Sequence, residues 1–189
     1  MSGGSAVAAG ISFLVSGACI AVFFATEKEA WGRANDATIA LFAALMIPPV
    51  LEIYQRYAPG SKPVVLLPTV LGVTGLLVVV ITSGLTALAK LDWLLSAKIG
   101  AFGFGGFVAW MIWLSTLILR EGGLPDALAW FGLATAAMLG VVVAMAIRFI
   151  RINGSFSGEV QPPISLWIVF GLAFLCVPAW TIWLGLSLD

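Results

Sequence analysis

Long runs of residues without a charged side chain restrict the fold of this chain more than any other feature. The first run, residues 5–25, holds 21 residues with no charge. A helix rises ~1.5 Å per residue, so a run of this length crosses the ~30 Å hydrocarbon core of a bilayer. No basic residue precedes it, and no small-residue cleavage motif stands near its end. We therefore interpret it as a retained first membrane span and not as a cleaved signal peptide.

Charged residues are too few to build a water-facing surface. The chain of 189 residues is 61% hydrophobic and 10% charged, and its mean hydropathy is +1.11. Soluble domains carry about 25% charged residues, so this composition predicts a lipid-facing surface. The 9 basic and 9 acidic residues cancel. No net field remains to attract nucleic acid, and nucleic-acid binding is not expected.

Histidine is absent from the sequence. Its absence excludes His-ligated haem, His-bearing zinc or di-iron sites and a Ser-His-Asp triad. Cys19 and Cys176 both lie inside apolar runs, where cysteine is typically a small buried hydrophobe and not a metal ligand or half of a disulfide. We therefore predict no metal site and no cofactor.

Five further apolar runs follow along the chain. The predicted spans lie at residues 37–55, 64–89, 99–119, 127–147 and 164–188. The charged segment Lys90–Lys98 is too short to cross a bilayer, and we expect a brief interfacial helix there. Together with the first span, these runs predict an all-α membrane protein, a bundle of six transmembrane helices that forms one domain.

The second span is the least regular of the six. Asp36 stands immediately before an apolar run, where its side chain is predicted to cap the first free amides of a helix. Only 15 uncharged residues separate Asp36 from Glu52. At the helical rise they cover roughly 22 Å, which is too short to cross alone. The span must therefore continue through Glu52 toward Tyr54 and Tyr57.

Glu52 is the leading candidate for a functional residue. An acid at membrane depth costs about 2.5–3.5 kcal/mol at the centre of a span. Glu52 also follows Pro48 and Pro49, which remove two backbone donors. A discontinuous helix beside a buried acid is how some transporters build an ion site. We nevertheless prefer a structural role for Glu52, because Arg56 stands four residues later in the favourable order for a surface ion pair. Asp36 is a second candidate, for which we prefer the capping role.

Small residues recur at four-residue spacing on one face of the fourth span and one face of the fifth. The members are Ala101, Gly105 and Ala109 on the fourth span, and Ala136, Gly140 and Ala144 on the fifth. Gly100, Gly103 and Gly106 give the fourth span a second smooth face. Small residues let lipid-embedded helices approach closely. We interpret these faces as packing within one bundle, with docking of another subunit or of a flat apolar ligand as the alternative.

Six spans place both termini on one side of the membrane. The loops on the opposite side hold six basic residues (Lys28, Arg33, Lys90, Lys98, Arg148 and Arg151), and the terminal side holds three (Arg56, Lys62 and Arg120). The positive-inside rule therefore predicts that both termini lie outside. Tryptophans near span ends support the boundaries through interfacial anchoring. The clearest are Trp31, Trp93, Trp130, Trp167 and Trp183.

Two short motifs carry a resemblance to a known family. Residues 31–36 read WGRAND, and residues 119–125 read LREGGLP. In these motifs the chain resembles small uncharacterised bacterial integral-membrane proteins, which carry a W-G-x-x-N-D loop before the second span and an L-R-x-G-x-L-P turn between later spans. That family has no assigned activity. The resemblance implies a location in the bacterial cytoplasmic membrane and supplies no catalytic residue.

These observations favour a non-enzymatic protein, either an accessory or interaction subunit or a protein that binds lipid or another apolar ligand. The expected partners are membrane lipids, other membrane subunits or a second copy of the chain. The alternative is a small transporter or channel with Glu52 as its proton or cation site. An intramembrane enzyme would need polar residues clustered at one depth. Scattered hydroxyls are present instead, and each can bond its own helix; they are Ser12, Ser16, Thr82, Ser83, Ser115 and Thr116.

Overall fold

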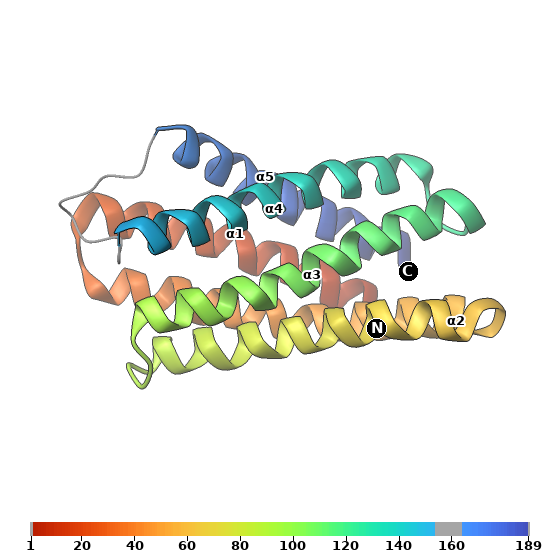
Figure 1. Ribbon diagram of the computed structural model, residues 1–189, viewed down its shortest axis with the longest axis horizontal. Helices are drawn as coiled ribbons and strands as arrows, with labels where there is room; N and C mark the ends of the chain where they lie inside the picture. The colour runs from red at the N-terminus through yellow and green to blue at the C-terminus, as the bar shows by residue number, and fades with distance from the viewer. Residues whose placement is uncertain (1, 154–163, 189) are drawn as a thin grey trace.

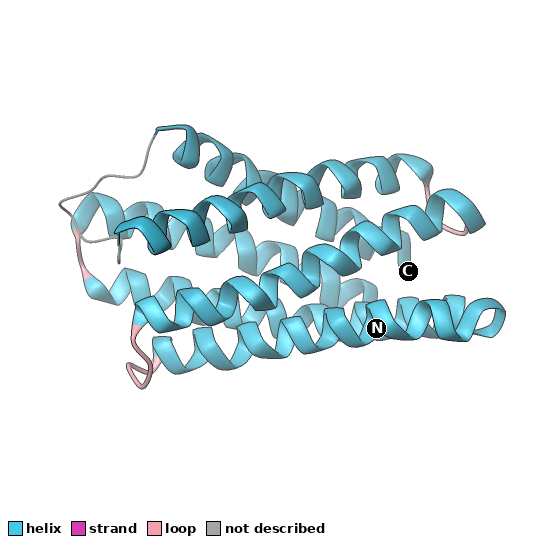
Figure 2. Cartoon of the chain, viewed as in Figure 1, coloured by secondary structure: helices cyan, strands magenta, loops and turns pink. Residues whose placement is uncertain are grey.

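The computed structural model describes residues 2–153 and 164–188, and this part of the chain is helical throughout apart from short connections (Figure 1; Figure 2). The helices are α1 (Ser2–Thr26), α2 (Glu29–Ala87), α3 (Trp93–Glu121), α4 (Asp126–Asn153) and α5 (Ile164–Leu188). Six segments are long and apolar enough to cross a membrane. They are Ser2–Thr26, Glu29–Pro59, Val64–Ala87, Trp93–Glu121, Asp126–Arg148 and Ile168–Leu188. The predicted all-α bundle of six spans is confirmed.

Five helices hold six spans because α2 reverses direction without losing its helical backbone. Its first arm ends at Pro59, and its second arm begins at Val64. Figure 1 shows the ribbon turning back on itself at the end of the molecule that carries the yellow part of α2. The sequence predicted separate spans with a loop between them. The reversal instead occupies only the few residues between the arms, so the arms lie side by side and antiparallel.

The connection between α1 and α2 is shorter than predicted. Only Glu27 and Lys28 lie outside the helices, and α2 begins at Glu29. The prediction that Asp36 caps a helix is therefore wrong. The negative charge of Glu29 is stabilising at the N-terminus of α2, which is the positive end of the helix dipole. Glu29 also forms an ion pair with Arg33 one turn later, with an N–O distance of 2.7 Å. These contacts extend the helix outward from the apolar run.

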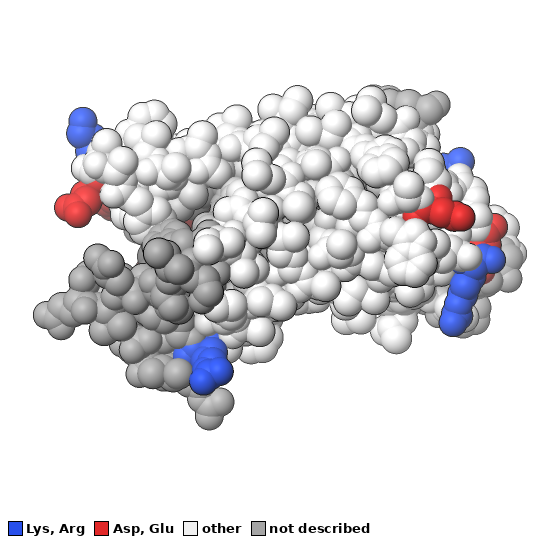
Figure 3. All heavy atoms as spheres, turned by 90° about the horizontal axis from the view of Figure 1, so that it is seen from above, with Lys and Arg blue, Asp and Glu red and all other residues white. Residues whose placement is uncertain are grey.

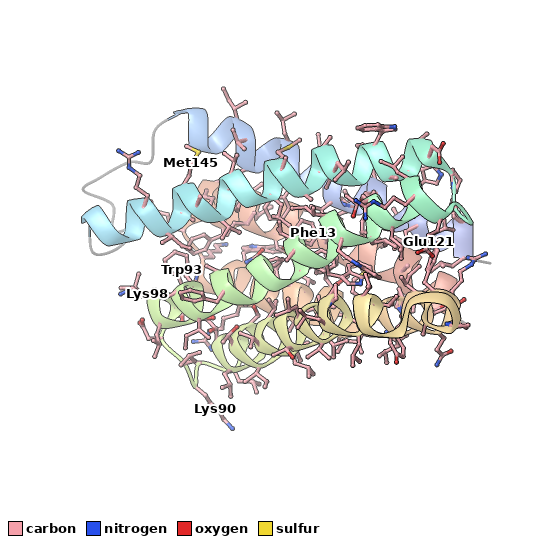
Figure 4. The ribbon with its side chains drawn as sticks, turned by 45° about the vertical axis from the view of Figure 1, so that its right-hand side comes forward. Phe13, Lys90, Trp93, Lys98, Glu121 and Met145 are labelled. Atoms are coloured by element: carbon pink, nitrogen blue, oxygen red, sulfur yellow. The ribbon has the colours of Figure 1, made fainter. Side chains whose placement is uncertain are left out.

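The predicted interfacial helix at Lys90–Lys98 does not exist as a separate element. Trp93–Lys98 is the start of α3. Asp92 caps this helix, because its side chain accepts a hydrogen bond from the Leu95 amide at 3.1 Å. Figure 4 shows Lys90, Trp93 and Lys98 at one end of the molecule and Glu121, the last residue of α3, at the other. The charged segment therefore begins a span instead of lying along the membrane surface.

The helices pack in a closed ring. Each packs against its neighbour in sequence, and α1 also packs against α5. Aromatic rings contact one another across the interior, with centroid distances of 4.7 Å between Phe13 and Phe42 and 5.8 Å between Phe42 and Phe107. Phe107 stacks on Trp110, whose ring meets Trp180 at 6.1 Å. This chain of rings joins α1, α2, α3 and α5 and fills the centre of the bundle.

Glycines bring the second arm of α2 against α3. A side-chain carbon added to Gly103 would lie 2.7 Å from the backbone oxygen of Gly75, and one added to Gly75 would lie 2.4 Å from the backbone oxygen of Gly103. Gly106 meets the oxygen of Leu71 at 2.8 Å in the same way. Backbone therefore packs on backbone, as expected where no hydrophobic force drives helices together in lipid.

Charged residues gather at the two ends of the molecule, and the belt between them is apolar. On the face seen in Figure 3, Lys, Arg, Asp and Glu occupy the ends and leave the middle free of charge. Large apolar side chains face outward along the spans, among them Leu67, Phe102 and Leu175. Trp31, Trp93, Trp130 and Trp183 are exposed, as interfacial anchors require, whereas Trp110 and Trp180 are fully buried. Trp167 lies among residues whose side chains the structure does not describe.

Candidate functional site

Four serines on one face of α1 bond to the first arm of α2. The hydroxyl of Ser12 donates to the Thr38 carbonyl at 2.8 Å, and that of Ser16 donates to Asn35 Oδ1 at 2.7 Å. Ser5 donates to the Leu45 carbonyl at 2.6 Å, and Ser2 donates to Oε2 of Glu52. Hydrogen bonds between helices hold lipid-embedded helices in register. Two hydroxyls predicted to bond their own helix, Ser12 and Ser16, thus join neighbouring helices.

Pro48 and Pro49 do not break α2. The helix continues through both residues, and the prediction of a discontinuous helix is wrong. Proline lacks an N–H, so Pro49 leaves the carbonyl four residues earlier, that of Leu45, without its helical donor. The Ser5 hydroxyl takes that place at 2.6 Å. A neighbouring helix thus compensates for the lost bond, which lets the proline pair remain within a regular span.

Glu52 lies beside a hollow in the surface at the end of the bundle that carries both termini. The hollow has a volume of about 370 Å³ and is lined by Glu52, Gln55, Arg56 and Leu188. We call it the Glu52 hollow. In Figure 1 the N and C labels lie short of the bend of α2. The first arm of α2, which carries Glu52, therefore extends beyond the N-terminal end of α1 and the C-terminal end of α5. The step between short and long helices leaves the hollow open.

Glu52 and Arg56 share this hollow without pairing to each other. The carboxylate of Glu52 instead accepts the hydrogen bond from Ser2. Arg56 is exposed and makes no hydrogen bond or ion pair with a side chain in the described part of the chain. The prediction of a simple surface ion pair between Glu52 and Arg56 is therefore wrong. An acid and a base that do not pair with each other therefore line the same hollow.

Asp36 belongs to a different end of the molecule. It is half-buried, and Asn35 Nδ2 donates to its carboxylate at 3.4 Å. Glu52 follows Asp36 by sixteen helical steps, roughly 24 Å at the helical rise. Between them the inner face of α2 carries Phe42, Met46 and Val50, all fully buried. The two acids therefore do not form one site.

The predicted small-residue rows are divided between the interior and the surface. On α4, Ala136 is fully buried, Gly140 is half-buried and Ala144 is exposed. On α3, Ala101 and Gly105 are half-buried and Ala109 is exposed. A side-chain carbon at Gly105 would meet nothing within 4 Å. The close contact of α3 with α2 runs through Gly103 and Gly106 instead, which belong to the second smooth face of that span.

The sequence did not predict a set of unpaired polar side chains in the interior of the bundle. Within residues 2–153 and 164–188, four buried polar side-chain atoms have no hydrogen-bond partner. They are Trp110 Nε1, Ser115 Oγ, Thr135 Oγ1 and Trp180 Nε1. The available signal was the position of Trp110 and Trp180 in the interior of their spans, because tryptophan in membrane helices otherwise gathers at the ends.

The described residues hold no cluster of three or more His, Cys, Asp or Glu side chains that could bind a metal ion. Cys19 on α1 and Cys176 on α5 are both free thiols. No family model, no curated protein and no solved structure matches the chain significantly. A function for this chain is therefore inferred from the geometry of the Glu52 hollow and of the buried polar atoms.

Proposed function

We propose that this chain is a non-enzymatic protein of a bacterial cytoplasmic membrane that binds phospholipid headgroups in the Glu52 hollow. The observation that carries the proposal is that Glu52 and Arg56 open into one hollow without pairing to each other. A headgroup with a phosphate and a primary ammonium, as in phosphatidylethanolamine, matches both charges. The bacterial location rests on the resemblance in the WGRAND and LREGGLP motifs.

The chemistry of the hollow supports a zwitterionic headgroup. Arg56 presents a planar guanidinium that binds phosphate oxygens in pairs. Glu52, held by Ser2, offers the acceptor that a primary ammonium requires. A hollow of about 370 Å³ lies within the range of small-molecule sites. Leu188 adds an apolar wall, and the outward-facing apolar residues of the spans provide the surface for acyl chains.

Lipid preference tests the proposal directly. Native mass spectrometry of the purified protein with phosphatidylethanolamine, phosphatidylcholine and phosphatidylglycerol should show the most adducts with phosphatidylethanolamine, because the methylated ammonium of phosphatidylcholine has no N–H to donate. Glu52→Gln should remove the preference for phosphatidylethanolamine over phosphatidylglycerol. Arg56→Gln should weaken the binding of all three lipids. Lys98→Gln, at the end of the molecule opposite the Glu52 hollow, is the matched control and should leave the binding of all three lipids unchanged. Equal binding of all three lipids by the unmodified protein would contradict the proposal.

A transporter or channel with Glu52 as its proton or cation site is the second candidate, and the half-buried hydrogen bond from Ser2 to this acid favours it. The same variant separates the two functions. Loss of proton or solute flux in liposomes with Glu52→Gln, together with an unchanged lipid preference, assigns Glu52 to transport. If Glu52→Gln loses the lipid preference and the unmodified protein shows no flux, Glu52 is assigned to headgroup binding.

A role as an accessory subunit is compatible with headgroup binding. The open space at Gly105 and the exposure of Ala109 leave part of one small-residue row uncovered in the single chain. Gentle affinity purification from native membranes, with stoichiometry and absorbance recorded, identifies a partner subunit or a second copy on this face.

A further inference from the structure

The interior between α3, α4 and α5 contains polar side chains that a dry apolar core does not need. Trp110, Ser115 and Trp180 are fully buried, and Thr135 is 1% exposed. None of their polar side-chain atoms has a hydrogen-bond partner. We call these four residues the donor cluster. Unpaired polar atoms are destabilising in any buried site, and most of all in lipid, where no solvent reaches them.

The hydroxyls of the donor cluster behave differently from other buried hydroxyls of the same bundle. Thr69 donates to the Val65 carbonyl at 2.7 Å, and Thr82 donates to the Val78 carbonyl at 2.8 Å. In a membrane helix, a threonine hydroxyl usually donates a hydrogen bond to a backbone carbonyl of the preceding turn. Ser115 and Thr135 do not form such a bond. Their hydroxyls are therefore free to bind something else.

The geometry around Gly132 brings two of these groups together. A side-chain carbon at Gly132 of α4 would lie 2.4 Å from Ser115 Oγ of α3 and 2.7 Å from Trp180 Nε1 of α5. Both atoms therefore face the same point beside the α4 backbone. Thr135 follows one turn later on α4, and the Trp110 ring stands edge-on to Trp180 at 6.1 Å. Ser115 and Gly132 each lie six residues from the α3–α4 connection, about 9 Å into the bundle.

We propose that the donor cluster binds an uncharged oxygen acceptor, either a water molecule or the carbonyl oxygen of a small apolar ligand. An indole N–H only donates, and each hydroxyl can also donate, so the bound group must accept. A cation is excluded by the two indole donors. An anion is disfavoured because none of the four side chains carries a positive charge to balance it in a buried site. This proposal does not depend on headgroup binding in the Glu52 hollow.

Stability changes of opposite sign distinguish an occupied site from a dry one. If the site is occupied, Ser115→Ala and Thr135→Val each remove a bond to the occupant, and the Tm should fall by about 2–4 °C. If the site is dry, each change removes an unpaired buried hydroxyl, and the Tm should stay constant or rise. Thr69→Val is the matched control, because its hydroxyl bonds its own helix. An unchanged or raised Tm for both variants overturns the proposal.

The indole N–H groups give a readout that does not depend on a variant folding. In ¹⁵N-labelled protein in detergent, the Trp180 indole proton should resonate downfield, as a hydrogen-bonded N–H does, and exchange slowly. A free indole N–H at that position overturns the proposal. Native mass spectrometry then identifies the source of the acceptor. An added mass that persists in the unmodified protein and is lost in Ser115→Ala indicates an apolar ligand, and a cross-peak between the indole proton and water without added mass indicates water.

Discussion

At the scale of single residues, the bond from Ser5 to the Leu45 carbonyl explains how a proline pair fits inside a membrane helix. Ser5→Ala should destabilise the protein by roughly 1 kcal/mol, since it leaves a carbonyl that already lacks its helical donor without a partner. Thermal unfolding in detergent, followed by circular dichroism, measures the loss. Ser187→Ala is the control, because that exposed hydroxyl bonds only its own helix, at the Trp183 carbonyl. Equal stability of the two variants would refute this role for Ser5.

The role of Glu52 could be predicted only in part from its sequence neighbours. Its position late in the second span, after two prolines, is visible in the sequence, and it remains the leading candidate. Its hydrogen-bond donor is not visible, because Ser2 lies fifty residues away and reaches Glu52 only through the antiparallel packing of α1 on α2. The expected ion pair with Arg56 follows a local helix rule. In the structure, Glu52 instead accepts a hydrogen bond from Ser2 of α1.

At the scale of helices, the number of spans followed from apolar length alone, whereas the helix ends did not. Residues 164–188 were predicted as the last span, and α5 has those bounds. The starts of α2 and α3 lie several residues further out than expected. Charged residues such as Glu29 and Arg33 end the hydrocarbon segment, but they are good helix formers and continue the helix into the interface. Hydropathy marks the lipid core and not the end of the backbone hydrogen bonds.

The contact between α2 and α3 allows a matched test with two glycines of one helix. Gly103→Ala should destabilise the bundle by about 1–3 kcal/mol, because the added carbon meets the Gly75 backbone oxygen, which cannot rotate away. Gly105→Ala should be neutral or stabilising by up to about 1 kcal/mol, since its added carbon meets open space and alanine favours a helix. Unfolding in a detergent series compares the two variants. Similar losses for both would show that helix propensity, and not the backbone contact, decides the result.

At the scale of the whole molecule, the ring of helices determines which residues share a site. The contact of α1 with α5 closes the ring and brings the two ends of the chain together, because a side-chain carbon at Gly185 would lie 2.6 Å from the Gly3 carbonyl. Leu188 thereby reaches the Glu52 hollow. Neither this hollow nor the donor cluster follows from local patterns, because each combines helices distant in sequence. Small-residue spacing marks faces that allow close packing, but it does not say which helix lies opposite.

The orientation of the bundle remains a prediction from the distribution of basic residues, and it has a direct test. In a Cys19→Ala, Cys176→Ala background, Ala89→Cys places a thiol in the exposed connection before α3, and Ala127→Cys places one in the exposed first turn of α4. Both changes keep every charge, so the bias of six basic residues against three is preserved. With the termini outside, a membrane-impermeant maleimide should label Ala127→Cys in intact cells and Ala89→Cys only after permeabilisation. The reverse pattern would place the termini and the Glu52 hollow in the cytoplasm, and the headgroups available to that hollow would be those of the inner leaflet.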